Sequence, residues 1–284
     1  MKEILIPSTQ SDTLVSQLQT LYRTFKNLTA HEQVHFNLEN LQWGCPLLIL
    51  PLSAHISCTG STFTAPSNAN TKSYLDAVSF PAGVDSLSSF EQQIRAYKTY
   101  LPLSVLRTDA GVGRERLEAE FLNMVVAIVG DIPGTQNALR YPVGELVTNI
   151  FEHSGEQQGF IFGQWYPKKG YLDICIVDCG RGLTRAYKEE RGLDLSDEEA
   201  IAEAMKGTSA KSDTERGYGI HTSKDVVCRA LKGGFVMVSG NTGFYAYESK
   251  EQLVSLPNFN WPGVIVAYRI PKPTGEINIT PYLE

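Results

Sequence analysis

Hydrophobic residues in the first hundred positions recur at spacings that alternate between those of strands and those of helices. In residues 12–28 they include Leu14, Leu18 and Leu21, which fall on one face of an amphipathic helix. Residues 34–38 alternate between apolar and polar, as in a half-buried strand. The pattern predicts strands at 1–7, 34–38 and 74–80, helices at 12–28 and 46–54, and a loop at 59–71. This order is typical of a small α/β unit.

The second half of the chain has the same two spacings in longer runs. They predict helices at 114–129, 138–153, 197–205 and 220–231, and strands at 160–165, 172–177, 235–239, 244–247 and 264–270. Pro142 is placed in the first turn of its helix, where a missing backbone N–H costs nothing. Two glycines within residues 109–113 predict a boundary between a small α/β domain at 1–108 and a larger domain at 109–284.

Three motifs stand in order within the larger domain. Glu145, Asn149 and His153 recur every four residues along one predicted helix, so they share one of its faces. Two glycine-containing motifs follow: Asp178-x-Gly180-x-Gly182 and Gly217-x-Gly219. Taken singly, each has a plain structural interpretation as a solvated helix face, a cap or a turn. Their occurrence together, each beside the strand or helix it needs, favours a ligand site.

Together the motifs resemble the sequence boxes of the GHKL ATPase superfamily, which includes gyrase B, the heat-shock chaperone ATPase, histidine kinases and the mismatch-repair ATPase. They are similar to its N-box and its first and second glycine boxes. The matching segments are Glu145-Leu-Val-Thr-Asn149-Ile-Phe-Glu-His153, Ile176-Val-Asp178-Cys-Gly180-Arg-Gly182 and Arg216-Gly217-Tyr-Gly219-Ile. Within the family, the anti-sigma-factor serine kinases look most similar. The resemblance covers residues 109–284 and implies a Bergerat-type two-layer α/β sandwich with a mixed sheet, in a chain of the α/β (α+β) class.

The resemblance implies roles for three side chains. Asn149 would hold Mg²⁺ at the phosphates of ATP through a neutral side-chain oxygen, a hard ligand that suits this cation. Glu145 matches the general base, which would orient or deprotonate a water or a hydroxyl group of a protein substrate. Asp178 matches the residue that accepts a hydrogen bond from the adenine amino group. ATP and Mg²⁺ are therefore the expected cofactors.

The glycines match backbone segments that approach the nucleotide in this family. Gly180 and Gly182 would let the chain pass close to the base without a Cβ clash. Gly217 and Gly219 precede a predicted helix, where backbone N–H groups and the helix dipole can face phosphate oxygens.

A polar segment at residues 206–216 would form a lid over the nucleotide. From it, Lys211 and Arg216 would reach the phosphates, although a solvated loop explains these charges equally well. His153 is interpreted as a structural residue at the end of its helix. One departure from the gyrase type is Val264, which stands where a threonine would contact the base, so base recognition would depend more on Asp178 and water.

The N-terminal unit resembles a STAS domain, the fold of anti-sigma-factor antagonists, in the strand and loop of residues 34–41. Those antagonists have Ser or Thr after an Asp at their phosphorylation site, whereas this chain has Gly44-Cys45-Pro46. The phosphoacceptor is missing, so the unit would be a fixed partner or regulatory module. A generic α/β interaction module explains the same pattern.

Charge and cysteine content narrow the classes of partner. The net charge of −6 leaves no excess of Lys and Arg to neutralise the phosphates of nucleic acids or membranes. The five cysteines form no C-x-x-C pair, which favours a reducing cytoplasm. The most apolar run, at residues 45–56, is interrupted by proline and too short to span a bilayer.

These features predict a cytoplasmic, ATP- and Mg²⁺-binding regulatory protein with a protein partner. Two activities remain open: a slow ATPase, or a protein serine kinase acting in partner switching. The alternative is a catalytically inert ATP-binding scaffold. The presence of Glu145 favours the active forms, and a homodimer remains a further alternative.

Overall fold

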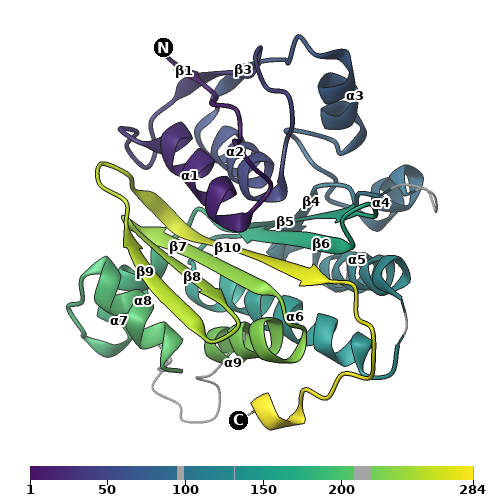
Figure 1. Ribbon diagram of the computed structural model, residues 1–284. Coiled ribbons are helices and arrows are strands. Elements are labelled where there is room, and N and C mark those ends of the chain that lie inside the picture. The colour runs from purple at the N-terminus through teal and green to yellow at the C-terminus, as the bar shows by residue number, and fades with distance from the viewer. Residues whose placement is uncertain (95–98, 131, 208–218, 284) are drawn as a thin grey trace.

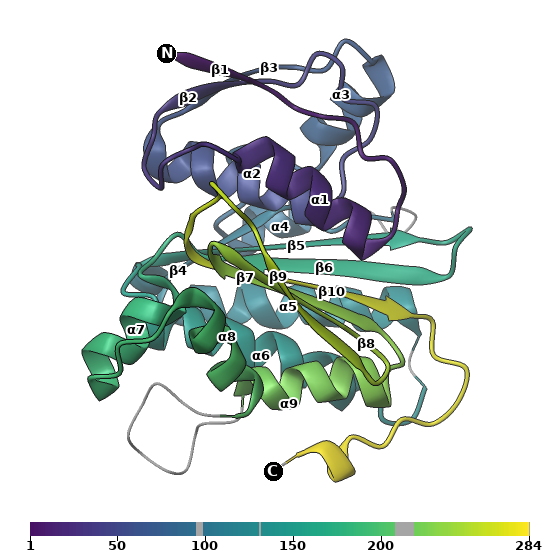
Figure 2. The same ribbon diagram turned by 60° about the vertical axis from the view of Figure 1, so that its left-hand side comes forward.

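Two sheets and two groups of helices alternate in four stacked layers (Figures 1 and 2). The computed structural model describes residues 1–94, 99–130, 132–207 and 219–283. A three-stranded sheet forms the outer layer, with α1 (Leu14–Phe25) and α2 (Pro46–Thr59) beneath it. A seven-stranded sheet follows, and α5 (Val112–Val129), α6 (Thr135–His153) and α9 (Gly219–Asp225) cover its far face. The chain therefore has the mixed α and β architecture that its sequence predicts.

The small outer sheet is parallel. Its order is β1 (Lys2–Leu5), β2 (Val34–Asn37) and β3 (Thr62–Thr64). The strand at 34–38 and the helices α1 and α2 confirm the sequence-based predictions, although α2 continues to Thr59.

Two predictions for this part of the chain are wrong. The expected loop at 59–71 contains β3 and the start of α3 (Ala69–Ala77), and the expected strand at 74–80 lies in α3 and the turn that follows. The side chain of Asn68 accepts hydrogen bonds from the N–H groups of Asn70 and Thr71 and so begins the helix. A helix this short has too few apolar positions to display its period in the sequence.

The large sheet has the order β4-β5-β6-β10-β7-β8-β9, and every neighbouring pair is antiparallel. Its strands are β4 (Ser104–Arg107), β5 (Gln158–Tyr166), β6 (Tyr171–Val177), β7 (Gly234–Gly240), β8 (Thr242–Tyr247), β9 (Lys250–Ser255) and β10 (Trp261–Pro271). The expected mixed sheet is therefore wrong. β10 returns between β6 and β7 and runs antiparallel to both, which separates two strands that are parallel to each other. β4 precedes the expected boundary at residue 109 and already belongs to this sheet.

Most helices of the larger domain begin where the sequence predicts. Three helices have not yet been described: α4 (Leu87–Gln93), which precedes that domain, α7 (Gly182–Arg191) and α8 (Asp197–Met205). α8 has the predicted bounds, because Ser196 and Glu199 form a reciprocal capping box at its start. The elements α4, α7, β4 and β9 were not predicted from the sequence. α6 begins at Thr135, so the placement of Pro142 in a first turn is wrong. It lies inside the helix, where its side chain is buried and its missing N–H removes one helix hydrogen bond.

The central strands β5, β6, β7 and β10 of the large sheet are buried on both faces, which explains their nearly continuous apolar sequences. Phe160 and Phe162 of β5 face α1 and α2, whereas Ile161 between them faces the opposite helical layer. On β6, Val177 faces α1 and α2, whereas Ile176 faces the opposite helical layer. Side chains alternate across a strand, so both alternating sets must be apolar when both faces are covered.

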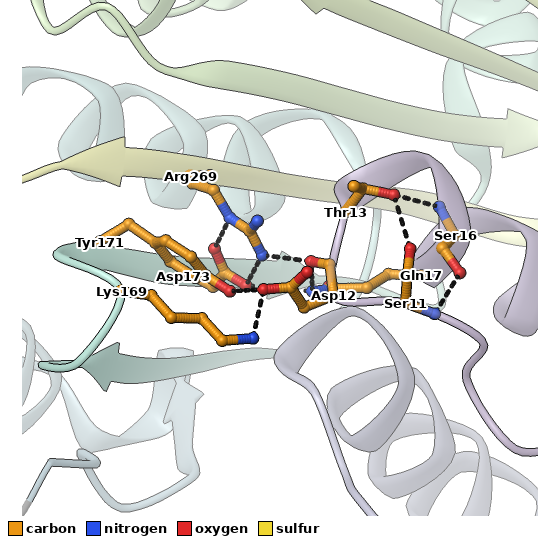
Figure 3. Close-up of polar contacts among 9 residues, drawn as sticks. All are labelled: Ser11, Asp12, Thr13, Ser16, Gln17, Lys169, Tyr171, Asp173 and Arg269. Carbon is orange, nitrogen blue, oxygen red and sulfur yellow. Dashed lines mark hydrogen bonds and ion pairs between the residues drawn. The ribbon is translucent and has the colours of Figure 1, made fainter.

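A polar network fastens the start of α1 to strands β6 and β10 of the large sheet (Figure 3). Arg269 of β10 lies opposite Asp173 of β6, and its Nε and Nη2 donate to the two carboxylate oxygens at 2.6 and 2.7 Å. Gln17 of α1 donates to Asp173 Oδ2 at 3.1 Å. Arg269 also donates to the backbone oxygen of Asp12 at 2.6 Å and stacks on Tyr171, with 3.6 Å from its Cζ to the ring centroid.

Two further donors complete this network at Asp12. The Tyr171 hydroxyl donates to Asp12 Oδ2 at 2.7 Å, and Lys169 pairs with the same oxygen. These hydrogen bonds, that of Lys169 first, lower the pKa of Asp12 to about 2. Burial instead raises the pKa of Asp173, against the opposing effect of Arg269. The N-terminal unit is therefore held to the sheet by specific polar contacts as well as by apolar packing.

Candidate functional site

A pocket opens on the helical side of the large sheet, between α6, α7 and α9. Apolar side chains form most of its wall: Leu146, Ile150, Ile176, Leu183, Ala186, Tyr187, Ala204, Ile220, Val264 and Val266. Asn149, His153, Asp178, Gly182 and Gly219 also line it. The pocket thus brings together residues of all three sequence motifs. A largely apolar hollow with a few polar groups is the usual form of a small-molecule site.

Asp178 lies just beyond the end of β6 and is 3% exposed. Its Oδ1 accepts a hydrogen bond from the Gly180 N–H at 2.9 Å, whereas its Oδ2 has no hydrogen-bond partner among the described residues. Its backbone N–H donates to Val264, and its backbone oxygen accepts from the indole of Trp261 at 2.9 Å. Burial raises the pKa of Asp178 to about 7, despite the backbone hydrogen bonds that lower it. A buried carboxyl group with one uncommitted oxygen is therefore fixed at the pocket wall.

Glycines let three backbone segments approach one another around Asp178. A Cβ atom on Gly180 would lie 2.2 Å from the Ser154 oxygen, and one on Gly263 would lie 2.2 Å from Asp178 Oδ1. Gly182 has a φ of +66°, and a Cβ atom there would lie 2.8 Å from the Pro262 oxygen. Each position requires glycine for close backbone approach, so the structure supplies a packing reason for the Asp-x-Gly-x-Gly spacing.

Asn149 lies one turn before the C-terminal end of α6 and contributes a polar group to the same wall. Its Nδ2 is buried and has no hydrogen-bond partner in the described part of the chain. A buried amide that lacks a partner fits a position that meets a polar ligand. The described residues contain no cluster of three or more His, Cys, Asp or Glu side chains that could hold a metal ion. A cation held by Asn149 would therefore need further oxygens from a ligand or water, as Mg²⁺ commonly does.

Glu145 lies one turn before Asn149 but does not line the main pocket. It borders a second, shallower hollow together with Tyr141 of α6 and Thr280 and Leu283 of the C-terminal segment. Its carboxylate reaches the start of α9, since a Cβ atom on Gly219 would lie 2.5 Å from Glu145 Oε2. The acidic group thus stands at the junction between the two hollows.

His153 ends α6 and contacts Glu190 of α7, with Nδ1 to Oε2 at 3.2 Å. Arg181, between the two glycines of its motif, pairs with Glu190 and with Glu189 and donates to the His153 backbone oxygen. These contacts join the end of α6 to α7, so the interpretation of His153 as a structural residue agrees with its position.

Three predicted ligand residues, Lys211, Arg216 and Gly217, lie outside the described residues. Lys206, at the start of the expected lid, forms an ion pair with Glu203 at 2.7 Å.

No model of a known protein family matches this chain, and no curated protein matches it significantly. None of the helices in the described ranges is long and apolar enough to cross a membrane.

The residues that α7 contributes to the pocket were not predicted from the sequence. Leu183, Ala186 and Tyr187 line it, and Tyr187 is almost fully buried. Their spacing of three and four residues on one face was a helical signal in the sequence. Ser239 was also missed: its hydroxyl accepts from the Leu183 N–H at 3.1 Å and donates to the Gly263 oxygen at 3.0 Å, next to Gly182. Only a contact between β7 and α7 in the fold could reveal that role.

Proposed function

We propose that this chain binds ATP together with Mg²⁺ in the pocket between α6, α7 and α9, as a regulatory protein of the GHKL type. One observation carries the proposal: Asn149, Asp178, Gly182 and Gly219 come from three separate sequence motifs and line a single pocket. If the motifs were only a solvated helix face and unrelated turns, nothing would require their residues to meet at one pocket.

Asp178 supplies the chemistry for recognising adenine. Its uncommitted Oδ2 can accept a hydrogen bond from the amino group at position 6 of the base. Guanine has a carbonyl oxygen there, which cannot donate. The apolar walls, including Ile176 and Val264, suit the faces of a planar ring. Because Val264 offers no side-chain hydrogen bond, Asp178 and ordered water would account for selectivity.

Asn149 would hold Mg²⁺ through its side-chain oxygen, with phosphate and water oxygens completing the coordination. The bound cation would neutralise charge on the phosphates. In this arrangement the phosphates extend from the Asp178 end of the pocket towards Gly219 and Glu145.

Glu145 would act as the general base at the junction of the two hollows. In an ATPase it would orient the attacking water. In a protein serine kinase it would accept the proton of a substrate hydroxyl group that approaches through the second hollow. The partner would then be a cytoplasmic protein rather than a nucleic acid. An inert ATP-binding scaffold is the second candidate, and turnover measurements separate it from the other two.

The Asn149→Ala variant tests the proposed site. Calorimetric titration of the parent chain with ATP is expected to give tighter binding with Mg²⁺ than without it. The variant should lose about tenfold or more in affinity in the presence of Mg²⁺ and little in its absence, because only the cation contact has gone. Thr148→Ala, on the exposed neighbouring position of α6, is the control and should behave as the parent does.

Two outcomes would argue against this site. Absence of ATP binding to the parent chain would remove the proposed function. Equal losses for Asn149→Ala with and without Mg²⁺ would remove Asn149 as the metal ligand.

The Glu145→Gln variant tests the proposed base. Phosphate release or phosphoryl transfer should fall by about 10²–10⁴-fold, because the amide cannot accept a proton. ATP affinity should stay within about threefold of the parent value, since Glu145 lies outside the main pocket.

Glu152→Gln makes the same charge change two turns later on an exposed position of α6 and should retain turnover. Unchanged turnover in Glu145→Gln would exclude this residue as the base. ATP binding without any turnover in the parent chain, even with candidate partners added, would favour the scaffold.

A further inference from the structure

Two cysteines that are distant in sequence lie next to each other at the edge of the proposed site. Cys58 belongs to the last turn of α2, and Cys179 follows Asp178 directly. Cys179 belongs to the buried cluster that packs against α2. Gln158 precedes Phe160 by two residues, and Phe160 pairs with Val177, which precedes Cys179 by two. Each thiol has the largest effect on the pKa of the other. The side-chain amide of Gln158 donates to Cys58 Sγ, at 3.8 Å. Cys58 and Cys179 thus come from separate layers of the fold and lie on either side of Gln158, which brings both partners of a disulfide into one neighbourhood.

The two thiols differ in the way that a reactive and a resolving cysteine differ. Cys58 is exposed, and the adjacent Cys179 thiol, followed by the hydrogen bond from Gln158, lowers its pKa against the opposing effect of desolvation. Cys179 is 7% exposed, and the same contact raises its pKa. Oxidation-sensitive cysteines typically combine exposure, thiolate character and an adjacent second thiol.

The other cysteines lack these properties. Cys45, Cys175 and Cys228 are all buried, and burial raises the pKa of each. They therefore provide internal controls for selective oxidation.

We propose that Cys58 and Cys179 form a disulfide in response to a peroxide, and that this bond ties α2 to the Asp178 turn and weakens ligand binding there. The Cys58 thiolate attacks one oxygen of hydrogen peroxide, which gives a sulfenic acid and hydroxide. The Cys179 sulfur then attacks the Cys58 sulfur and expels its hydroxyl group. That group leaves as water with the Cys179 proton. The two thiols are oxidised by two electrons, and the peroxide is reduced to water.

The new bond would act directly on Asp178. A disulfide requires its sulfurs to be about 2.05 Å apart, much closer than two free thiols can approach each other. Formation of the bond therefore draws the end of α2 and Cys179 towards each other. Asp178 and Gly180 on either side are joined by the hydrogen bond from the Gly180 N–H to Asp178 Oδ1. A shift of Cys179 consequently changes the position of the carboxyl group that we assign to adenine recognition.

The disulfide can be tested without any ligand. The full chain is treated with hydrogen peroxide, free thiols are counted under denaturing conditions, and non-reduced peptides are identified by mass spectrometry. Two of the five thiols should disappear, with Cys58 and Cys179 in one linked peptide. Cys58→Ser should prevent the link, whereas Cys228→Ser should leave it intact. Oxidation of Cys58 to sulfinic acid with Cys179 still free, or no reaction at Cys58, would overturn the proposal.

The effect on the site has two readouts. Deuterium exchange of the peptide that contains Gly180 should change on oxidation and return with dithiothreitol; this readout does not depend on nucleotide. ATP affinity, which rests on the proposed function, should fall by about tenfold and recover on reduction. If the disulfide forms but changes neither the deuterium exchange nor the ATP affinity, the proposed effect of the disulfide on the Asp178 turn is refuted. Absence of ATP binding to the reduced chain would count against the proposed function alone, since exchange would still report on the turn.

Discussion

The Asp178→Asn variant is expected to bind ATP about ten- to a hundredfold more weakly than the parent chain and yet to resist unfolding better at pH 8. The affinity falls because a charged acceptor in a buried site is replaced by a neutral amide. The stability rises because the parent chain must keep a carboxylate ionised where the side chain is 3% exposed. Activity and stability should therefore change in opposite directions at one residue.

The sign of the pH dependence follows from the pKa of Asp178. Burial raises this pKa from 3.8 to about 7, so the folded chain binds a proton that the unfolded chain has already released in this range. The free energy of unfolding of the parent chain therefore decreases as the pH rises from about 4 to 7. Above pH 7 the ionisation of Asp178 causes no further decrease. The Asp178→Asn variant has no carboxyl group at this position, so its free energy of unfolding should not show this decrease. Its advantage over the parent should be about 1–3 kcal/mol at pH 8 and should shrink near pH 5.

Urea unfolding at pH 5 and pH 8, paired with ATP titration at pH 8, measures both effects. Asp76→Asn makes the same charge change on an exposed position of α3 and should alter neither quantity. An equal stability difference at both pH values would contradict the raised pKa. Unchanged ATP affinity would remove Asp178 from base recognition.

The Asp173→Ala variant is expected to lose about 3–5 kcal/mol of stability, the largest loss among the substitutions considered. Asp173 is 2% exposed and holds the guanidinium group of Arg269 by two hydrogen bonds. Its removal leaves a mostly buried positive charge and the amide of Gln17 without their shared acceptor. Urea unfolding at neutral pH measures the loss.

A double variant tests the cause. Asp173→Leu together with Arg269→Met removes both charges and should recover much of the stability, because a buried charge pair contributes little beyond an apolar pair of similar size. Asp76→Ala is again the exposed control. A loss below about 1 kcal/mol for Asp173→Ala would show that water reaches Arg269 and that the network does not hold the N-terminal unit to the sheet.

Sequence periodicity predicted the long elements well, because burial imposes it directly. α1 and α5 each place apolar residues on one face, and both appear close to their predicted positions. β5 and β6 were likewise found as apolar runs. Short elements were not predicted. α3 depends on the cap formed by Asn68, and the exposed residues of β9 give no apolar pattern.

Local sequence also determined the individual parts of the candidate site. The four-residue spacing put Glu145 and Asn149 on successive turns of α6, and Asp178 was correctly placed where a strand meets a turn. These assignments depend on residues that are neighbours in the chain, and short-range geometry is sufficient for them.

Only the tertiary structure decided which of these parts meet. It brought Asn149, Asp178 and Gly219 to one pocket, left Glu145 at its edge, and added Tyr187 from a helix that the sequence analysis had missed. It also set Cys58 beside Cys179 and made the large sheet wholly antiparallel. The reason is that β10 inserts between β6 and β7, and α2 packs on the face opposite the pocket. Such long-range packing depends on the fit of whole layers, which no local pattern of residues encodes.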